Sequence, residues 1–124
     1  MLADLTIKDF LAETAGSAPV PGGGSISALN GAIAAALTEM VAHLTVGKKK
    51  YADVQDDIIA LKAKADALQM ELLDLVQKDA EMFEPLSKAY GLPKETEEQK
   101  AEKARTMEAA LKDACSVPLL IMEK

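Results

Sequence analysis

One acidic side chain occupies a position where an apolar residue is expected. Between Val54 and Ala89, apolar residues recur at alternating steps of four and three, and Asp79 takes one of these positions. A carboxylate on an apolar helix face loses solvation, and such costly groups often have a function. The alternative is a slight rotation of the helix, or an ion pair with a neighbour such as Lys78. The pattern leaves both interpretations open and makes Asp79 the first candidate for acid–base chemistry.

A glycine-rich loop, PVPGGGS at residues 19–25, precedes the most apolar stretch of the chain. At a helix start, Gly22, Gly23 and Gly24 would expose backbone N–H groups and the positive end of the helix dipole, which can bind an anion or a carbonyl oxygen. The segment lacks the Gly-Lys-Ser/Thr ending of a phosphate-binding loop and the strand that precedes a dinucleotide fingerprint. The alternative is a tight turn in which Ser25 caps the helix.

The only concentrated positive charge in the chain is Lys48, Lys49 and Lys50, which Tyr51 follows. This run could attract a polyanionic ligand. The alternative is a solvated basic turn that complements the carboxyl end of a helix. The single histidine and the single cysteine have no partners from which a metal site or an activated thiol could be built.

Four helices are predicted to position these groups, because no stretch shows strand alternation. We expect them at about residues 6–14 with Thr6 as the cap, at 25–46, at 51–90, and from a capping box at Thr96 to near the end of the chain. The second is apolar or small on all sides, so we expect it to be buried on most sides. The third keeps a coiled-coil-like seam for about five heptads. The sequence therefore predicts an all-α fold, a single domain built as a bundle of long antiparallel helices.

The charge and composition exclude several classes of partner. A net charge of −6 argues against binding to nucleic acid and to a membrane surface. One cysteine indicates a reducing cytoplasm, and the first 14 residues do not have the pattern of a signal peptide. The stretch 26–46 is long enough to span a membrane, but Glu39 within it would cost a few kcal/mol there. We therefore interpret this stretch as a helix of a soluble protein.

Three blocks of the sequence, in order, resemble the formimidoyltetrahydrofolate cyclodeaminase / methenyltetrahydrofolate cyclohydrolase family. They are PVPGGGSISALNGAIAAALTEMVAHLTVGKKKYADV at 19–54, LLDLVQKDAEMFEPLSKAYGLPKETEEQKAEKAR at 72–105, and VPL at 117–119. In the second block of the family, an acid followed by an aromatic residue precedes Leu-Pro and a polar helix start. Asp79 and Phe83 match that acid and that aromatic residue. His43 departs from the pattern, since an asparagine or similar polar residue is expected there.

The resemblance implies an all-α homodimer or larger assembly that acts on a folate. One reaction of the family closes 5-formimidoyltetrahydrofolate to 5,10-methenyltetrahydrofolate and releases ammonia, a step of histidine degradation. The other interconverts the methenyl form with 10-formyltetrahydrofolate by addition of water. The substrate is a tetrahydrofolate derivative that can carry a polyglutamate tail, with no tightly bound cofactor and no metal. The sequence does not separate the two reactions.

The resemblance also assigns roles to residues of this chain. Asp79 is the catalytic carboxylate, which stabilises a cationic centre and moves a proton. The loop from Gly22 to Ser25 lets the backbone approach the pterin or the reacting bridge. The run from Lys48 to Lys50 binds the glutamate tail, and Tyr51 and Phe83 are further substrate contacts.

The end of the chain raises a competing interpretation. The family's domain continues with further helices, whereas this chain ends at Lys124 while its apolar pattern is still running. We therefore expect residues 1–124 to be an incomplete domain, truncated at the C-terminus. The competing interpretation is a catalytically silent helical oligomerisation or interaction module, since the seam of the third helix could serve oligomerisation alone.

Overall fold

The computed structural model describes all 124 residues, as helices joined by short connections and with no strand. The all-α fold predicted from the sequence is confirmed. In chain order the elements are the 3₁₀ turn η1 (Leu2–Asp4), α1 (Ile7–Ala15), α2 (Gly23–Thr45), the 3₁₀ segment η2 (Lys49–Val54), α3 (Gln55–Tyr90) and α4 (Glu97–Glu123).

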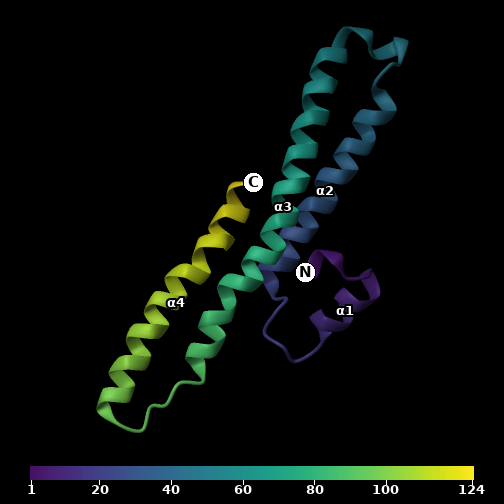
Figure 1. Cartoon of the computed structure of the whole chain (residues 1–124). Helices are drawn as coiled ribbons and strands as arrows, with labels where there is room; N and C mark the ends of the chain where they lie inside the picture. Colours follow the sequence, from purple (N-terminus) through teal and green to yellow (C-terminus); the bar gives the residue numbers. More distant parts are fainter.

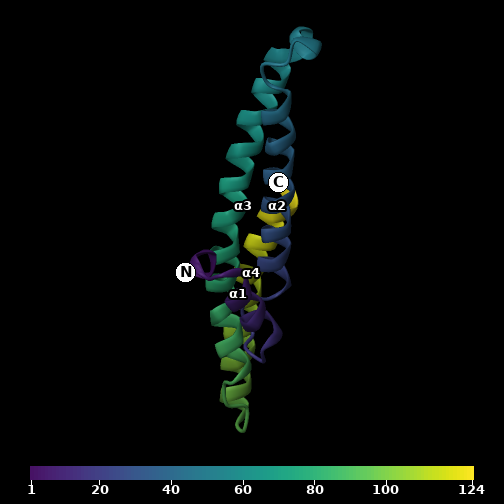
Figure 2. The same cartoon turned by 90° about the vertical axis from the view of Figure 1, so that its right-hand side faces the viewer.

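The three long helices run antiparallel and are staggered (Figure 1). α3 is the longest, with 36 residues, and it packs against α2 along its first half and against α4 along its second half. Figure 2 shows the molecule turned by 90° as a narrow rod, with α1 beside the lower part of the bundle. The end of α4 reaches the middle of α3, and the start of α2 lies about two-thirds of the way along α3. The three helices therefore overlap there, and this junction positions the candidate site.

Local sequence signals set most helix ends. The Thr6 hydroxyl accepts a backbone N–H at the start of α1, and Thr96 opens α4 with a complete capping box, so both predicted caps are confirmed. α2 begins two residues earlier than expected, with Gly22 as its N-cap, and Ser25 therefore lies inside the first turn and does not cap the helix. The third predicted helix begins as η2 and becomes α-helical at Gln55.

α2 has a small-residue face and a large-residue face, and the small one is buried. Ala28, Ala32, Ala35 and Ala42 pack toward α3. A Cβ added at Gly31 would lie 3.0 Å from a methyl group of Leu72 on α3. Small side chains thus let the two backbones approach closely.

The large apolar residues of α2 lie on the opposite side. We call Ile33, Leu37, Met40, Val41 and Leu44 the α2 outer stripe, and each of them is more than half exposed. The expectation that α2 is buried on most sides is therefore wrong, because along most of its length it has α3 as its only helical neighbour. By length and composition α2 could also cross a membrane, a test that core helices of soluble proteins pass as well.

The seam of α3 is buried over only part of its predicted length. Its members from Ala65 onward pack in the core, including Asp79, whereas Val54 and Leu61 are exposed. The first part of α3 faces α2, its last turns face α4, and the stretch between Glu71 and Asp79 lies beside both helices. Val76 and Ala80, which lie beside the seam, are also buried. They face the N-terminal segment, because both line pockets that include Leu2.

Candidate functional site

Asp79 lies about two-thirds of the way along α3, at the three-helix junction, with 9% of its surface exposed. Its only hydrogen-bond partner is the hydroxyl of Ser25 on α2, whose Oγ lies 3.3 Å from Oδ2. None of the six ion pairs of the protein includes Asp79. The carboxylate is therefore held in the core without a cation from the protein beside it.

The start of α2 lies directly against this carboxylate. A Cβ added at Gly24 would overlap both carboxylate oxygens of Asp79, so this position accepts only glycine without displacing the acid. A Cβ at Gly23 would meet nothing within 4 Å. The first backbone N–H groups of α2 have no partner within the helix, and they give this end a partial positive charge beside the carboxylate.

A pocket of 340 Å³ opens in front of Asp79. The glycine loop with Pro19 and Val20 forms one wall, α3 forms the floor, and α4 forms the opposite wall. The lining residues are Pro19, Val20, Gly22, Gly23, Gly24, Asp79, Phe83, Leu86, Leu111, Ala114, Cys115 and Pro118. Apart from Asp79, the wall contains no charged side chain. The arrangement suits a largely flat, apolar ligand that carries a positive centre.

The structure brings half of the ten predicted site residues together in one pocket. Gly22, Gly23, Gly24, Asp79 and Phe83 line the same pocket. Ser25 does not line it, because this side chain is fully buried behind Asp79 and donates to a backbone carbonyl of α3.

The wall contributed by α4 was not predicted from the sequence. Cys115 is exposed and lines the pocket, as does Leu111. The only sequence signal was the apolar repeat of α4. In the structure the buried positions of that helix are Ala110 and Val117, so the residues beside them face the pocket.

The lysine run lies far from this pocket within one chain. Lys48, Lys49, Lys50 and Tyr51 form the tip of the α2–α3 hairpin, at the opposite end of α2 from the glycine loop (Figure 1). The 23 residues of α2 separate the two by about 35 Å.

Local contacts organise the lysine tip. The Lys50 ammonium lies 5.7 Å from the centre of the Tyr51 ring, within cation–π range. The Gln55 side chain accepts from the backbone N–H of Gly47 and donates to the carbonyls of Thr45 and Tyr51. Hydrogen bonds therefore hold this turn in place, and the turn presents three ammonium groups.

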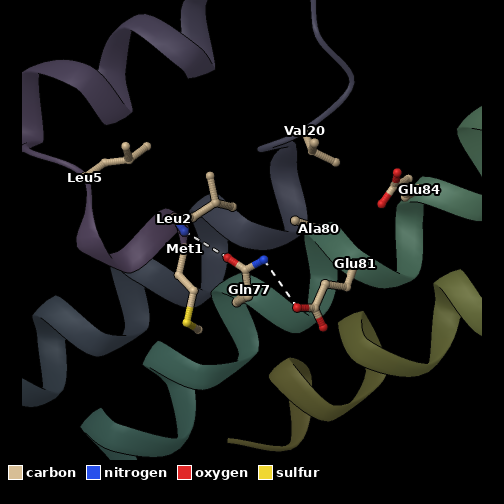
Figure 3. A pocket seen from close by; sticks show the side chains of 8 residues that line it. All are labelled: Met1, Leu2, Leu5, Val20, Gln77, Ala80, Glu81 and Glu84. Atoms are coloured by element: carbon tan, nitrogen blue, oxygen red, sulfur yellow. Dashed lines mark hydrogen bonds between the residues drawn. The ribbon is translucent and has the colours of Figure 1, made fainter.

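A second pocket, of 350 Å³, lies beside the glycine loop between the N-terminus and α3 (Figure 3). The backbone N–H of Leu2 donates to Gln77 Oε1 at 2.8 Å, and Gln77 Nε2 donates to Glu81 Oε1 at 3.3 Å. Glu84 completes its acidic side. The pocket includes neither Asp79 nor a glycine, so it is separate from the candidate site.

Comparison with known proteins decides the family. The family model described as formiminotransferase-cyclodeaminase matches residues 6–124. The chain belongs to the formiminotransferase-cyclodeaminase family. The resemblance predicted from the sequence is thereby confirmed.

Curated relatives of this family member carry two different names. It is 45% identical over 119 residues to a methenyltetrahydrofolate cyclohydrolase of Methylorubrum extorquens, which covers 96% of this chain and 57% of the relative. It is 32% identical over 122 residues to the formimidoyltransferase-cyclodeaminase of Mus musculus, which covers 98% of this chain and 23% of the relative.

A solved structure of the family shares the fold. The crystal structure of formiminotetrahydrofolate cyclodeaminase from Thermotoga maritima matches with a TM-score of 0.81 at 36% identity, over 99% of this chain and 57% of that chain. This member of the formiminotransferase-cyclodeaminase family thus spans little more than half of the bacterial cyclohydrolase and of the Thermotoga protein.

Proposed function

We propose that this chain carries the catalytic site of a folate one-carbon enzyme. The substrate is a tetrahydrofolate with a one-carbon group at N5, or bridging N5 and N10. The reaction is closure of 5-formimidoyltetrahydrofolate to 5,10-methenyltetrahydrofolate with release of ammonia, or hydrolysis of the methenyl form to 10-formyltetrahydrofolate. The names of the relatives from Methylorubrum and Mus musculus support this substrate class.

The observation that carries the proposal is the buried Asp79 carboxylate without a protein cation beside it. Both reactions pass through a tetrahedral carbon between N5 and N10, and both involve an amidinium-like cation. In a site of low dielectric constant, a fixed carboxylate stabilises such a cation more strongly than water does. The same group can take the proton of the attacking water, or give a proton to the leaving ammonia.

The remaining walls suit a pterin. Its flat ring needs an aromatic or apolar surface, which Phe83, Leu86 and Leu111 provide, and a close approach to backbone, which the glycine loop permits. A volume of 340 Å³ lies at the lower end of the range for small-molecule sites, about 300–1,000 Å³. The pocket therefore holds the reacting end of the folate and leaves its tail outside.

An absorbance assay tests the proposal, because methenyltetrahydrofolate absorbs strongly in the near ultraviolet. Loss of this absorbance faster than in buffer supports the cyclohydrolase reaction. Appearance of the absorbance from 5-formimidoyltetrahydrofolate supports the cyclodeaminase reaction. If the chain accelerates neither, the enzymatic proposal is wrong and the alternative of a silent helical module stands.

We further propose that the lysine tip binds the glutamate tail of a polyglutamylated folate. Replacing Lys48, Lys49 and Lys50 together with alanine should raise KM for a polyglutamylated substrate about five- to tenfold at low salt, since exposed charge pairs contribute less than about 1 kcal/mol each. KM for the monoglutamate should change less than about twofold. Steady-state kinetics on both substrates measures this. An equal rise for both would contradict tail binding.

The distance between tip and pocket is consistent with a homodimer in which two α2 outer stripes pack antiparallel. This pairing covers apolar surface that is exposed in one chain. The glycine loop and the lysine tip lie at opposite ends of α2. Antiparallel pairing of two α2 helices therefore places the lysine tip of each chain beside the glycine loop of its partner. We therefore propose a dimer whose folate sites each lie near the partner's tip.

Replacing Leu37 with aspartate should separate such a dimer into monomers. Leu37 lies at the centre of the α2 outer stripe, and a buried charge there should weaken association about tenfold or more. Leu119→Asp is the control, since Leu119 is an exposed residue of α4. Sedimentation velocity should show a dimer for the wild type and the control. A wild-type monomer, or a Leu37→Asp dimer, would contradict this interface.

A further inference from the structure

Ser25 is the one side chain that hydrogen-bonds to Asp79, and it is fully buried, with 0% of its surface exposed. Its Oγ lies 2.7 Å from the carbonyl oxygen of Val76 and 3.3 Å from Asp79 Oδ2. A serine hydroxyl carries one hydrogen and two lone pairs. The shorter contact favours donation to the Val76 carbonyl, which turns the lone pairs of Oγ toward Oδ2.

This geometry fits both protonation states of the acid. When Asp79 carries a proton on Oδ2, it can donate to Ser25 Oγ while the hydroxyl donates to Val76. When Asp79 is ionised, the hydroxyl can rotate to donate to Oδ2 instead. One buried side chain thus keeps the carboxyl hydrogen-bonded in either state, and an unsatisfied polar group in the core would be costly.

The two oxygens of Asp79 are not equivalent. Oδ2 faces Ser25, whereas Oδ1 has no hydrogen-bond partner in the protein. No fully buried side-chain oxygen or nitrogen in the chain lacks a partner, so Oδ1 must be accessible from the pocket. Gly24 packs against the same carboxylate and restricts its rotation.

We propose that Ser25 is a positioning residue, which holds Asp79 in both protonation states and leaves Oδ1 to exchange a proton with the ligand. Ser25 forms no covalent bond in the reaction. Only its hydroxyl hydrogen bond changes acceptor, between the Val76 carbonyl and Asp79 Oδ2. The proton moves between Asp79 and the water, ammonia or bridge nitrogen of the substrate. The identity of that proton donor or acceptor rests on the proposed function, whereas the coupling of Ser25 to Asp79 does not.

The test is a double-mutant cycle of Ser25→Ala and Asp79→Asn, read in turnover and in thermal unfolding. We expect Ser25→Ala to lower kcat about tenfold, the loss of one hydrogen bond in the transition state, with KM within about twofold of wild type. In the Asp79→Asn background, Ser25→Ala should lower kcat no further. The Tm shifts of the single variants should not add in the double variant, because the two side chains are in contact.

Two further variants keep the outcome interpretable. Ser27→Ala is the matched control, because Ser27 is exposed on the same turn of α2 and donates only to the carbonyl of Gly23. Ser25→Cys keeps the shape of the side chain, slightly enlarged, with a weaker donor, so its kcat should lie between those of Ser25→Ala and wild type. Circular dichroism verifies that each variant folds.

The failures of the two proposals are distinguishable. A wild-type chain that turns over, with Ser25→Ala as active as Ser27→Ala, overturns the positioning role and keeps the proposed function. Additive Tm shifts also overturn it. If the wild type has no activity, the proposed function fails, and the Tm cycle alone decides whether Ser25 positions Asp79.

Discussion

Replacing Asp79 with asparagine is expected to lower kcat by about 10²- to 10⁴-fold, the usual contribution of a positioned acid–base group. Asparagine has nearly the same shape and can still hydrogen-bond to Ser25, but it carries no charge and does not exchange a proton at neutral pH. The helical fold should persist. The free energy of unfolding should not fall, because the change removes a charge that has no protein cation beside it.

Steady-state kinetics and urea unfolding measured on the same samples check this prediction. Asp66→Asn is the matched control, since Asp66 is an exposed carboxylate on the same helix. Its kcat and stability should equal those of the wild type. Unchanged turnover in Asp79→Asn would remove Asp79 from the mechanism. A variant that fails to fold would instead show that the carboxylate is structural.

Replacing Gly24 with alanine should impair both stability and turnover. The new methyl group would occupy the space of the Asp79 carboxylate, so either α2 moves away from α3 or the acid rotates out of place. Overpacking of this kind typically costs about 1–3 kcal/mol. We expect a loss of that size in the free energy of unfolding, measured with urea, together with a fall in kcat of about tenfold or more.

Gly23→Ala provides the stability control for this change. The two positions are adjacent in the first turn of α2, but a methyl group at Gly23 meets nothing within 4 Å. Because alanine restricts the unfolded chain more than glycine does, Gly23→Ala should be neutral or stabilise by up to about 1 kcal/mol. Equal losses for both variants would show that the loop needs glycine for its backbone and not for the space it leaves to Asp79.

The sequence predicted those features that depend on a few neighbouring residues. The caps at Thr6 and Thr96 were found because each needs only a hydroxyl and residues within one turn. Asp79 was found because the seam on either side of it is regular. Its burial in the structure confirms that the acid occupies a core position of α3.

The orientation of α2 could not be predicted from hydrophobicity. Both of its faces are apolar, and the usual expectation places the larger side chains in the core. The structure buries the alanine face because small side chains bring the α2 and α3 backbones together, as the contact of Gly31 with Leu72 shows. Within this chain nothing covers the α2 outer stripe, so its large side chains stay exposed despite their hydrophobicity.

The contact between Ser25 and Asp79 could not be predicted from the sequence either. Ser25 and Asp79 are 54 residues apart, and neither belongs to a short motif that links a hydroxyl to an acid. Ser25 was interpreted as a cap or a substrate contact because it ends the glycine run. The wall from α4 was missed because its register against α3 depends on the length and shape of the connection after Gly91, which propensities do not give.

The stagger of the three helices has a consequence for how the site is assembled during folding. α2 pairs with α3 and α3 pairs with α4, so each hairpin is built from segments adjacent in sequence and can form through local contacts. The pocket, in contrast, joins the start of α2, the last third of α3 and the second half of α4. Bringing the start of α2 to the second half of α4 closes a long stretch of chain, so it comes later in folding. The contacts between these two segments should therefore open more readily than either hairpin. Amide hydrogens around the glycine loop should therefore exchange with solvent before those in the middle of α3.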